Sequence, residues 1–230
     1  MTLIYPSVAY AAHPLITDDT GTQGKRKFQV EFTGEATYDK ETDLDGKTRE
    51  TGGELSAIVS YGIIDNIDIV LGIPYQWARV KVDGVTVSDE DGLSDISLEG
   101  KWRFYDKERL SFALKPGITL PTGNEKRGLG AGRATYSMVF ITTKEIKKLA
   151  FHLNLSYTRN ENKVDERNDI WHASLASELE VVKDLKAVAN IGIERNPDKS
   201  SSTDPAFLLG GLIYSLLENL DIDLGFKVGL

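Results

Sequence analysis

Strict alternation of apolar and polar residues over residues 111–120 is the feature that most constrains this chain. Phe112 and Leu114 fall on one face of the segment, and Lys115 and Thr119 fall on the other. Side chains of a β-strand point alternately to opposite faces, so a period of two predicts a strand with one apolar and one polar face. A long Gly-rich loop, a second alternating segment and a short charged turn follow.

This unit of strand, long loop, strand and short turn recurs along the whole chain. The alternation predicts eleven strands, over residues 25–38, 55–61, 67–77, 96–105, 111–120, 133–143, 149–158, 171–181, 185–193, 206–214 and 220–230. Strands of roughly ten residues cross a bilayer when tilted, and outer-membrane barrels combine short periplasmic turns with longer extracellular loops. The pattern therefore predicts an all-β fold, an antiparallel up-and-down transmembrane β-barrel in the bacterial outer membrane.

The predicted loops are all polar or Gly-rich. We expect a long polar loop at residues 39–50, an acidic one at 83–91, a Gly-rich one at 121–132, a charged one at 159–168 and a Ser-containing one at 196–204. The Gly-rich loop lacks the following helix of a nucleotide-binding loop. We expect it to be a flexible external loop that folds into the barrel mouth.

The number of strands gives a further expectation. Eleven strands leave the first and the last running in the same direction, whereas bacterial single-chain barrels have even strand numbers. We therefore expect about 12 strands in the complete barrel, with residues 25–230 forming a barrel that lacks its last strand, or one strand miscounted. Twelve strands about 4.7 Å apart and tilted about 40° give a backbone diameter of roughly 24 Å. Such a lumen suits a small solute at most.

The N-terminal residues precede this barrel pattern. Residues 1–12 are apolar and end in the small-x-small sequence Ala9-Tyr10-Ala11, which indicates the remnant of a secretory signal peptide; a short disordered terminus is the alternative. Residues 13–24 are polar, and we expect them to form a periplasmic segment with a capped turn before the first strand. The pair Asp18-Asp19 lacks the remaining ligands of a calcium loop.

Aromatic residues gather at both ends of the apolar face, with aliphatic residues between them. The group near the short turns is Phe28, Tyr61, Phe104, Phe112, Phe151 and Tyr214, and the group near the long loops is Tyr38, Tyr75, Trp77, Tyr136, Tyr157 and Trp171. Two aromatic girdles around an aliphatic belt are typical of membrane barrels. The alternative is that these residues are core aromatics of a soluble β-sandwich.

The polar face is expected to line the lumen. Its candidate pore-lining residues are Glu31, Glu35, Glu99, Lys101, Arg103, Lys115, His152, His172, Glu178, Glu180, Glu194 and Lys227. Opposed acidic and basic rows in a narrow barrel can set ion selectivity. The alternative is that these charges pair and fill the interior, leaving no channel. For the two histidines, hydrogen bonding in the lumen is favoured.

Composition and motifs argue against several other classes. A net charge of −8, from 27 basic and 35 acidic residues, disfavours a nucleic-acid binder. The chain has no cysteine, and its histidines show no metal-ligand spacing. No Gly-x-Ser-x-Gly elbow is present. We therefore expect no enzyme, no cofactor and no metal site.

Several short motifs resemble a known family. They are HPLITDDTG at residues 13–21, KFQ at 27–29, YG at 61–62, DNID at 65–68, GLSD at 92–95 and LPTG at 120–123. They are similar to motifs of the outer-membrane "MetA-pathway of phenol degradation" family of transporters. The resemblance covers nearly the whole chain and implies an outer-membrane barrel that takes up aromatic compounds.

Three functional hypotheses follow. The first is passive transport of small solutes, aromatic or hydrophobic ones among them, with membrane lipid and the solute as the only expected partners. The second is a closed outer-membrane barrel with a structural or partner-binding role. The third is a soluble ligand-binding β-barrel whose apolar face points inward.

Overall fold

The computed structural model describes residues 14–43 and 46–230, so the expected signal remnant at residues 1–12 lies outside the described part of the chain. The strands are β1 Phe28–Asp43, β2 Gly46–Ile64, β3 Ile67–Val82, β4 Val85–Leu93, β5 Ile96–Lys107, β6 Leu110–Leu120, β7 Thr135–Ile146, β8 Leu149–Arg159, β9 Asp169–Val182, β10 Leu185–Glu194, β11 Ala206–Leu217 and β12 Leu220–Gly229. A short 3₁₀ helix, Glu125–Arg127, lies in the Gly-rich loop. No helix among the described residues is long and apolar enough to cross a membrane.

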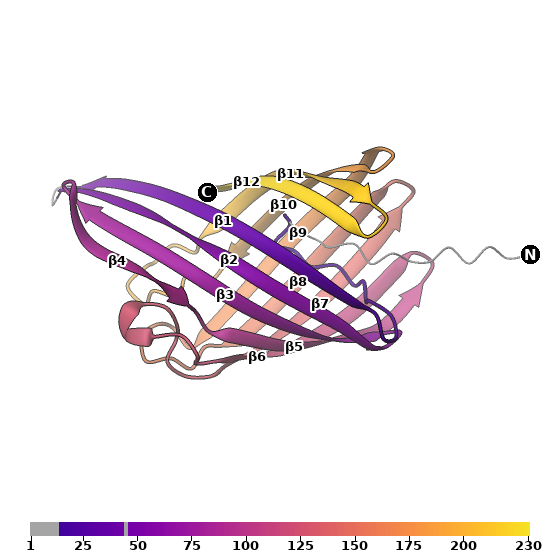
Figure 1. Cartoon of the computed structure of the whole chain (residues 1–230), viewed down its shortest axis with the longest axis horizontal. Coiled ribbons are helices and arrows are strands. Elements are labelled where there is room, and N and C mark those ends of the chain that lie inside the picture. Colours follow the sequence, from indigo (N-terminus) through magenta and orange to yellow (C-terminus); the bar gives the residue numbers. More distant parts are fainter. Residues whose placement is uncertain (1–13, 44–45) are drawn as a thin grey trace, which may run out of the picture.

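The strands form one antiparallel sheet that curls into a half-barrel (Figure 1). Its order is β1-β2-β3-β5 and then β6 to β12 in sequence, while β4 pairs only with β3. Within the described residues no ladder joins β1 to β12. Side chains meet across this seam instead, because Lys227 Nζ of β12 lies 2.6 Å from Glu35 Oε1 of β1. The predicted all-β antiparallel fold is confirmed, and the existence of a further closing strand stays a prediction.

Two predicted loops are wrong in part. Residues 83–91 were expected as an acidic loop, but most of them form β4, which extends the β3 hairpin. The sequence feature that indicates this hairpin is the Asp83-Gly84 pair. Its positive φ angles of 48° and 85° suit the tight hairpin turn that Asp-Gly sequences favour. Residues 39–50 are also mostly strand, because β1 and β2 stay paired up to Asp43 and Gly46. Polar sequence alone did not reveal this pairing, since residues 39–43 and 46–50, at the ends of these two strands, have no apolar face.

The apolar face of the sheet points outward. Phe28 is 72% exposed, Phe32 is 85% exposed and Leu224 is 80% exposed, whereas Ile141 and Ile213 on the concave face are buried. Exposed apolar surface of this extent marks a membrane contact. The hypothesis of a soluble barrel with an inward apolar face is therefore wrong.

A β-bulge corrects one further placement. The expected alternation puts Tyr105 on the inward face, next to Arg103. Pairing of β5 with β6 shifts between Arg103 and Tyr105, and the Tyr105 ring lies 5.4 Å from that of Phe112 on the outward face. A bulge adds one residue to a strand, so the facing of later residues is reversed.

The outward face makes a direct prediction about membrane assembly. Leu212 lies in the middle of β11, between Ala187 and Leu224 on the neighbouring strands. We expect Leu212→Arg to lower the free energy of unfolding in lipid vesicles by about 2–4 kcal/mol, the cost of arginine at the centre of a barrel's lipid face. Glu218→Arg, in the short turn after β11, is the control and should be nearly neutral. Equal stability of the Leu212→Arg variant and the native protein would contradict the outward placement.

Candidate functional site in the lumen

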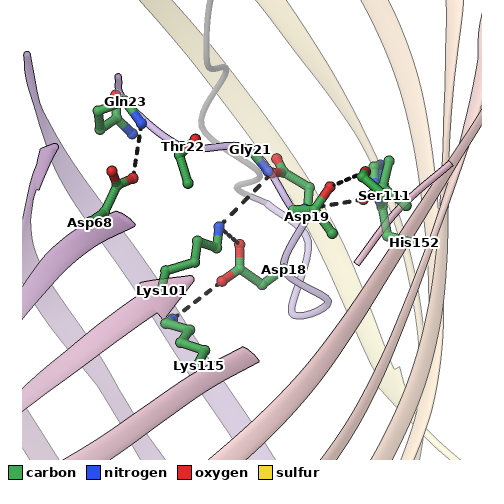
Figure 2. Close-up of polar contacts among 12 residues, drawn as sticks. Asp18, Asp19, Gly21, Thr22, Gln23, Asp68, Lys101, Ser111, Lys115 and His152 are labelled. Atoms are coloured by element: carbon green, nitrogen blue, oxygen red, sulfur yellow. Dashed lines mark hydrogen bonds and ion pairs between the residues drawn. The ribbon is translucent and has the colours of Figure 1, made fainter. Parts of the chain in front are cut away.

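Residues 14–24, which we call the strap, cross the concave face of the sheet instead of forming a separate segment outside it (Figure 2). A turn does precede the first strand, where Lys27 N donates to the carbonyl of Gly24 at 3.1 Å, but the strap before it makes contacts across the sheet that the sequence did not predict. Entry of the strap from the periplasmic side stays a prediction. The physical reason for its position is that inward-facing side chains bind the strap by hydrogen bonds and ion pairs along its length.

One end of the strap is held by apolar contacts. Leu15 is buried in a cluster whose other members come from β9, β10 and β11: Ala176, Val188, Leu209 and Ile213. Pro14 lies over Gly211 and Gly225, where an added Cβ would come within 2.8 Å and 2.7 Å of its ring. Glycine at these two paired positions leaves the space that the proline ring occupies.

Asparagine side chains hold the backbone in the middle of the strap. Asn190 Oδ1 accepts hydrogen bonds from the backbone N–H groups of Ile16 (2.8 Å) and Thr17 (3.1 Å). Asn154 Oδ1 accepts from Asp18 N at 2.8 Å, and Asn154 Nδ2 donates to Asp18 O at 2.7 Å. Thr17 Oγ1 donates to Ser174 Oγ at 2.7 Å. These bonds replace the hydrogen bonds to water that backbone groups lose when they are buried.

Ion pairs fix the Asp18 side chain (Figure 2). Lys101 Nζ lies 2.8 Å from Asp18 Oδ1, and Lys115 Nζ lies 3.2 Å from Asp18 Oδ2. Lys115 Nζ also lies 2.8 Å from Glu99 Oε2. Burial raises the pKa of the Asp18 carboxyl, but attraction and hydrogen bonds from the two lysines outweigh burial and hold the pKa well below its usual range. Folding lowers the pKa of Asp18, so its ion pairs stabilise the folded protein fully at any pH above the pKa of Asp18 in the unfolded chain. This stabilisation is lost as the pH falls through the lower pKa that Asp18 has in the folded protein.

Hydroxyl and carboxyl groups hold the remaining part of the strap. Thr20 N donates to Thr143 Oγ1 at 3.1 Å. Thr22 Oγ1 donates to the carbonyl of Asp65 at 2.9 Å, and Gln23 N donates to Asp68 Oδ2 at 2.9 Å. The strap thus extends from β9–β11 to the turn between β2 and β3.

Two separate cavities lie on either side of this arrangement. The loop-side cavity, of about 410 Å³, is lined by Ile58, Val70, Pro74, Glu99 and Lys115 among others. The turn-side cavity, of about 480 Å³, is bordered by strap residues 19–22 and by side chains from β5 to β10. The two cavities share no lining residue: Glu99 and Lys115 line the loop-side cavity, and strap residues 19–22 border the turn-side cavity.

The predicted pore-lining residues lie mostly on the concave face, but many are paired. Lys101, His152 and Glu178 are buried. Further predicted residues form pairs of opposite charge or histidine–carboxylate contacts: Glu99 with Lys115, Glu35 with Lys227, Glu180 with Lys148, Arg103 with Asp106 and His172 with Glu194. Glu31 is half-buried. The structure brings together Glu99, Lys101 and Lys115 around Asp18. It does not bring Glu35 and Lys227 to that site, because they lie on the two edge strands. Whether these residues line an open pore stays a prediction.

The predicted girdle residues all keep some exposure. Nine of the twelve are exposed, and Trp77, Phe112 and Phe151 are half-buried. Stacking accounts for the lower exposure of Phe112, whose ring centroid lies 5.8 Å from that of Phe140. Contact of these rings with lipid stays a prediction.

The strap and its partners were not predicted as a site. Asp18, Asn154 and Asn190 carry the contacts that matter most. Asparagine is disfavoured inside strands, so its presence at two inward positions, Asn154 and Asn190, was the available signal. Among the described residues no group of three or more metal-ligating side chains occurs.

A curled antiparallel sheet with an outward apolar belt and a charged interior defines an outer-membrane β-barrel. Two solved structures share this fold. The COG4313 outer membrane channel from Pseudomonas putida F1 matches with a TM-score of 0.66 and 16% identity, covering 92% of this chain and 90% of that one. A Pseudomonas aeruginosa FadL homologue matches with a TM-score of 0.52 and 11% identity, covering 88% of this chain and 66% of that one.

The sequence itself identifies the family. The chain belongs to the family described as "Putative MetA-pathway of phenol degradation", whose model matches residues 17–230. A search of curated proteins found no significant match. Fold, exposed apolar belt and family together place the protein in the bacterial outer membrane.

The Asp18 ion pairs give a prediction about the strap. Removing one partner of a buried pair costs about 3–5 kcal/mol, and since the Asp18 side chain keeps 27% exposure we expect the lower end for Asp18→Asn. Amide hydrogens of Thr17, Asp18 and Thr20 should then exchange roughly 100-fold faster in the variant. Asp165→Asn removes an exposed carboxylate paired with Lys199 and serves as control. Unchanged exchange in the strap of the Asp18→Asn variant would contradict its anchoring role.

Proposed function

We propose that the protein passes small amphipathic solutes, single-ring aromatic acids among them, through the lumen once the strap shifts. The observation that carries this proposal is the mixed chemistry of the loop-side cavity. Ile58, Val70 and Pro74 offer apolar contact, and the Lys115 ammonium offers a partner for an anion. Its volume of about 410 Å³ falls within the range of small-molecule pockets.

The lysines at the strap suggest how a solute can open the path. Asp18 presents a carboxylate to Lys115 and Lys101. An aromatic acid that enters the loop-side cavity carries the same group and can compete for Lys115. Loss of the pair between Asp18 and Lys115 weakens the attachment of the strap to β6. A bound ligand shifts a two-state equilibrium only through such differential contacts.

A closed barrel is the second candidate function. It is favoured by the density of contacts to the strap, because Leu15, Thr17 and Thr20 are all buried. In this case the strap stays in the lumen permanently, and the protein has a structural or partner-binding role without transporting solutes.

Swelling of proteoliposomes distinguishes the two candidates. The probe is benzenesulfonate, which is permanently anionic and therefore does not cross lipid as a neutral acid. We expect swelling in benzenesulfonate with the native protein, faster swelling with Asp18→Asn, and none in a naphthalenetrisulfonate that exceeds the lumen. Protein-free liposomes give the background. Absence of swelling with both proteins, each shown to be folded, would reject transport and support the closed barrel.

A further inference from the structure

The four N-terminal strands carry a row of cations outside the lumen. β1, β2, β3 and β4 extend beyond the other strands at the end opposite the short turns (Figure 1). There Lys40 pairs in register with Arg49, and Arg49 pairs with Lys81, so the three side chains lie side by side across three strands. Lys47 lies two residues from Arg49 on the same strand, and therefore on the same face.

This cationic row faces outward. Tyr38, two residues before Lys40, is 65% exposed on the lipid-facing side, and neither the β1–β2 nor the β2–β3 ladder has a register shift between that position and the row. The acidic residues at this level lie on the opposite face of the sheet from the cations. Asp39 and Glu50 are directly opposite each other in the β1–β2 ladder, and both face inward. A hairpin tip that merely needs solubility has no reason to separate its charges in this way.

Two described carboxylates near the row already have partners of their own. Asp89 forms an ion pair with Arg79 at 2.8 Å, and Asp83 Oδ1 accepts from the backbone N–H of Lys47 at 3.0 Å. Like charges directly opposite each other on a sheet are destabilising. Three adjacent cations therefore call for an anion from outside the chain.

The row borders a hollow that fits such an anion. A cavity of about 250 Å³ is lined by Lys40, Lys47, Arg49 and Lys81, with Thr48, Asp83 and Gly84 completing it. Arginine presents a planar fork of donors to phosphate, and lysines add point charge. A phosphate group surrounded by several such donors forms strong charge-assisted hydrogen bonds.

The depth of the row in the membrane indicates where the anion comes from. Tyr38 belongs to the predicted girdle at the headgroup level, and two residues further along a strand correspond to about 7 Å. Long-loop ends of outer-membrane barrels face outside. We propose that Lys40, Arg49 and Lys81 bind the phosphorylated headgroup of a glycolipid in the outer leaflet. This site is continuous with the lipid-facing wall and independent of the proposed transport.

Lipid preference in nanodiscs tests this site. The probe is diphosphorylated lipid A, compared with its dephosphorylated form in a phosphatidylcholine bilayer, with bound lipid counted by native mass spectrometry. We expect the native protein to prefer the diphosphorylated lipid, and Lys40→Gln, Arg49→Gln, Lys81→Gln combined to lower that preference by at least about tenfold. A triple variant of equal charge change, Lys107→Gln, Arg109→Gln, Lys183→Gln, alters exposed residues in or next to the short turns and should retain this preference.

Stability supplies a second readout that does not depend on lipid counting. Removing the repulsive row should leave the variant folded in detergent and at least as heat-stable as the native protein, while only the native protein should gain stability on adding diphosphorylated lipid A. Equal lipid preference of the native protein and the first triple variant would overturn the proposal. So would an equal gain in heat stability from the lipid in both.

Discussion

The carboxylate of Asp18 between Lys101 and Lys115 is the interaction on which the position of the strap depends. Two ammonium groups on neighbouring strands, β5 and β6, would repel each other inside the half-barrel without an acid between them. Glu99 neutralises Lys115, and Asp18 joins both lysines. The strap therefore completes the electrostatics of the wall as well as crossing it. Partners of this kind are strongly coupled, because a charge left alone in a poorly solvated interior is costly.

The rest of the strap follows from the same requirement that buried polar groups have partners. Asn154 and Asn190 hold its backbone, while Leu15 enters the apolar cluster of β9, β10 and β11. The strap is thus held by an apolar cluster on one side and by charged side chains on the other. The loop-side cavity has mixed chemistry of its own, since Ile58, Val70 and Pro74 line it together with Glu99 and Lys115.

Period-two alternation was sufficient to predict the class of fold and the eleven strands that follow one another across the sheet. It failed where one residue is added to a strand, as at Tyr105, and where both faces of a hairpin are polar, as over residues 39–50. Lys101, Lys115, His152 and Glu178 were correctly expected on the polar face. The grouping of Lys101 and Lys115 around Asp18 was not expected, because contacts between residues more than 80 positions apart leave no local pattern in a single sequence.

A reversible cross-link between strap and wall tests the central claim most directly. The chain has no cysteine, and Thr17 Oγ1 lies 2.7 Å from Ser174 Oγ, so Thr17→Cys with Ser174→Cys places two thiols in reach of a disulfide. The measurement is benzenesulfonate flux into liposomes before and after reduction. If the strap must move for transport, the oxidised protein passes no benzenesulfonate and reduction restores the flux. Equal flux through the fully cross-linked and the reduced protein would contradict the account.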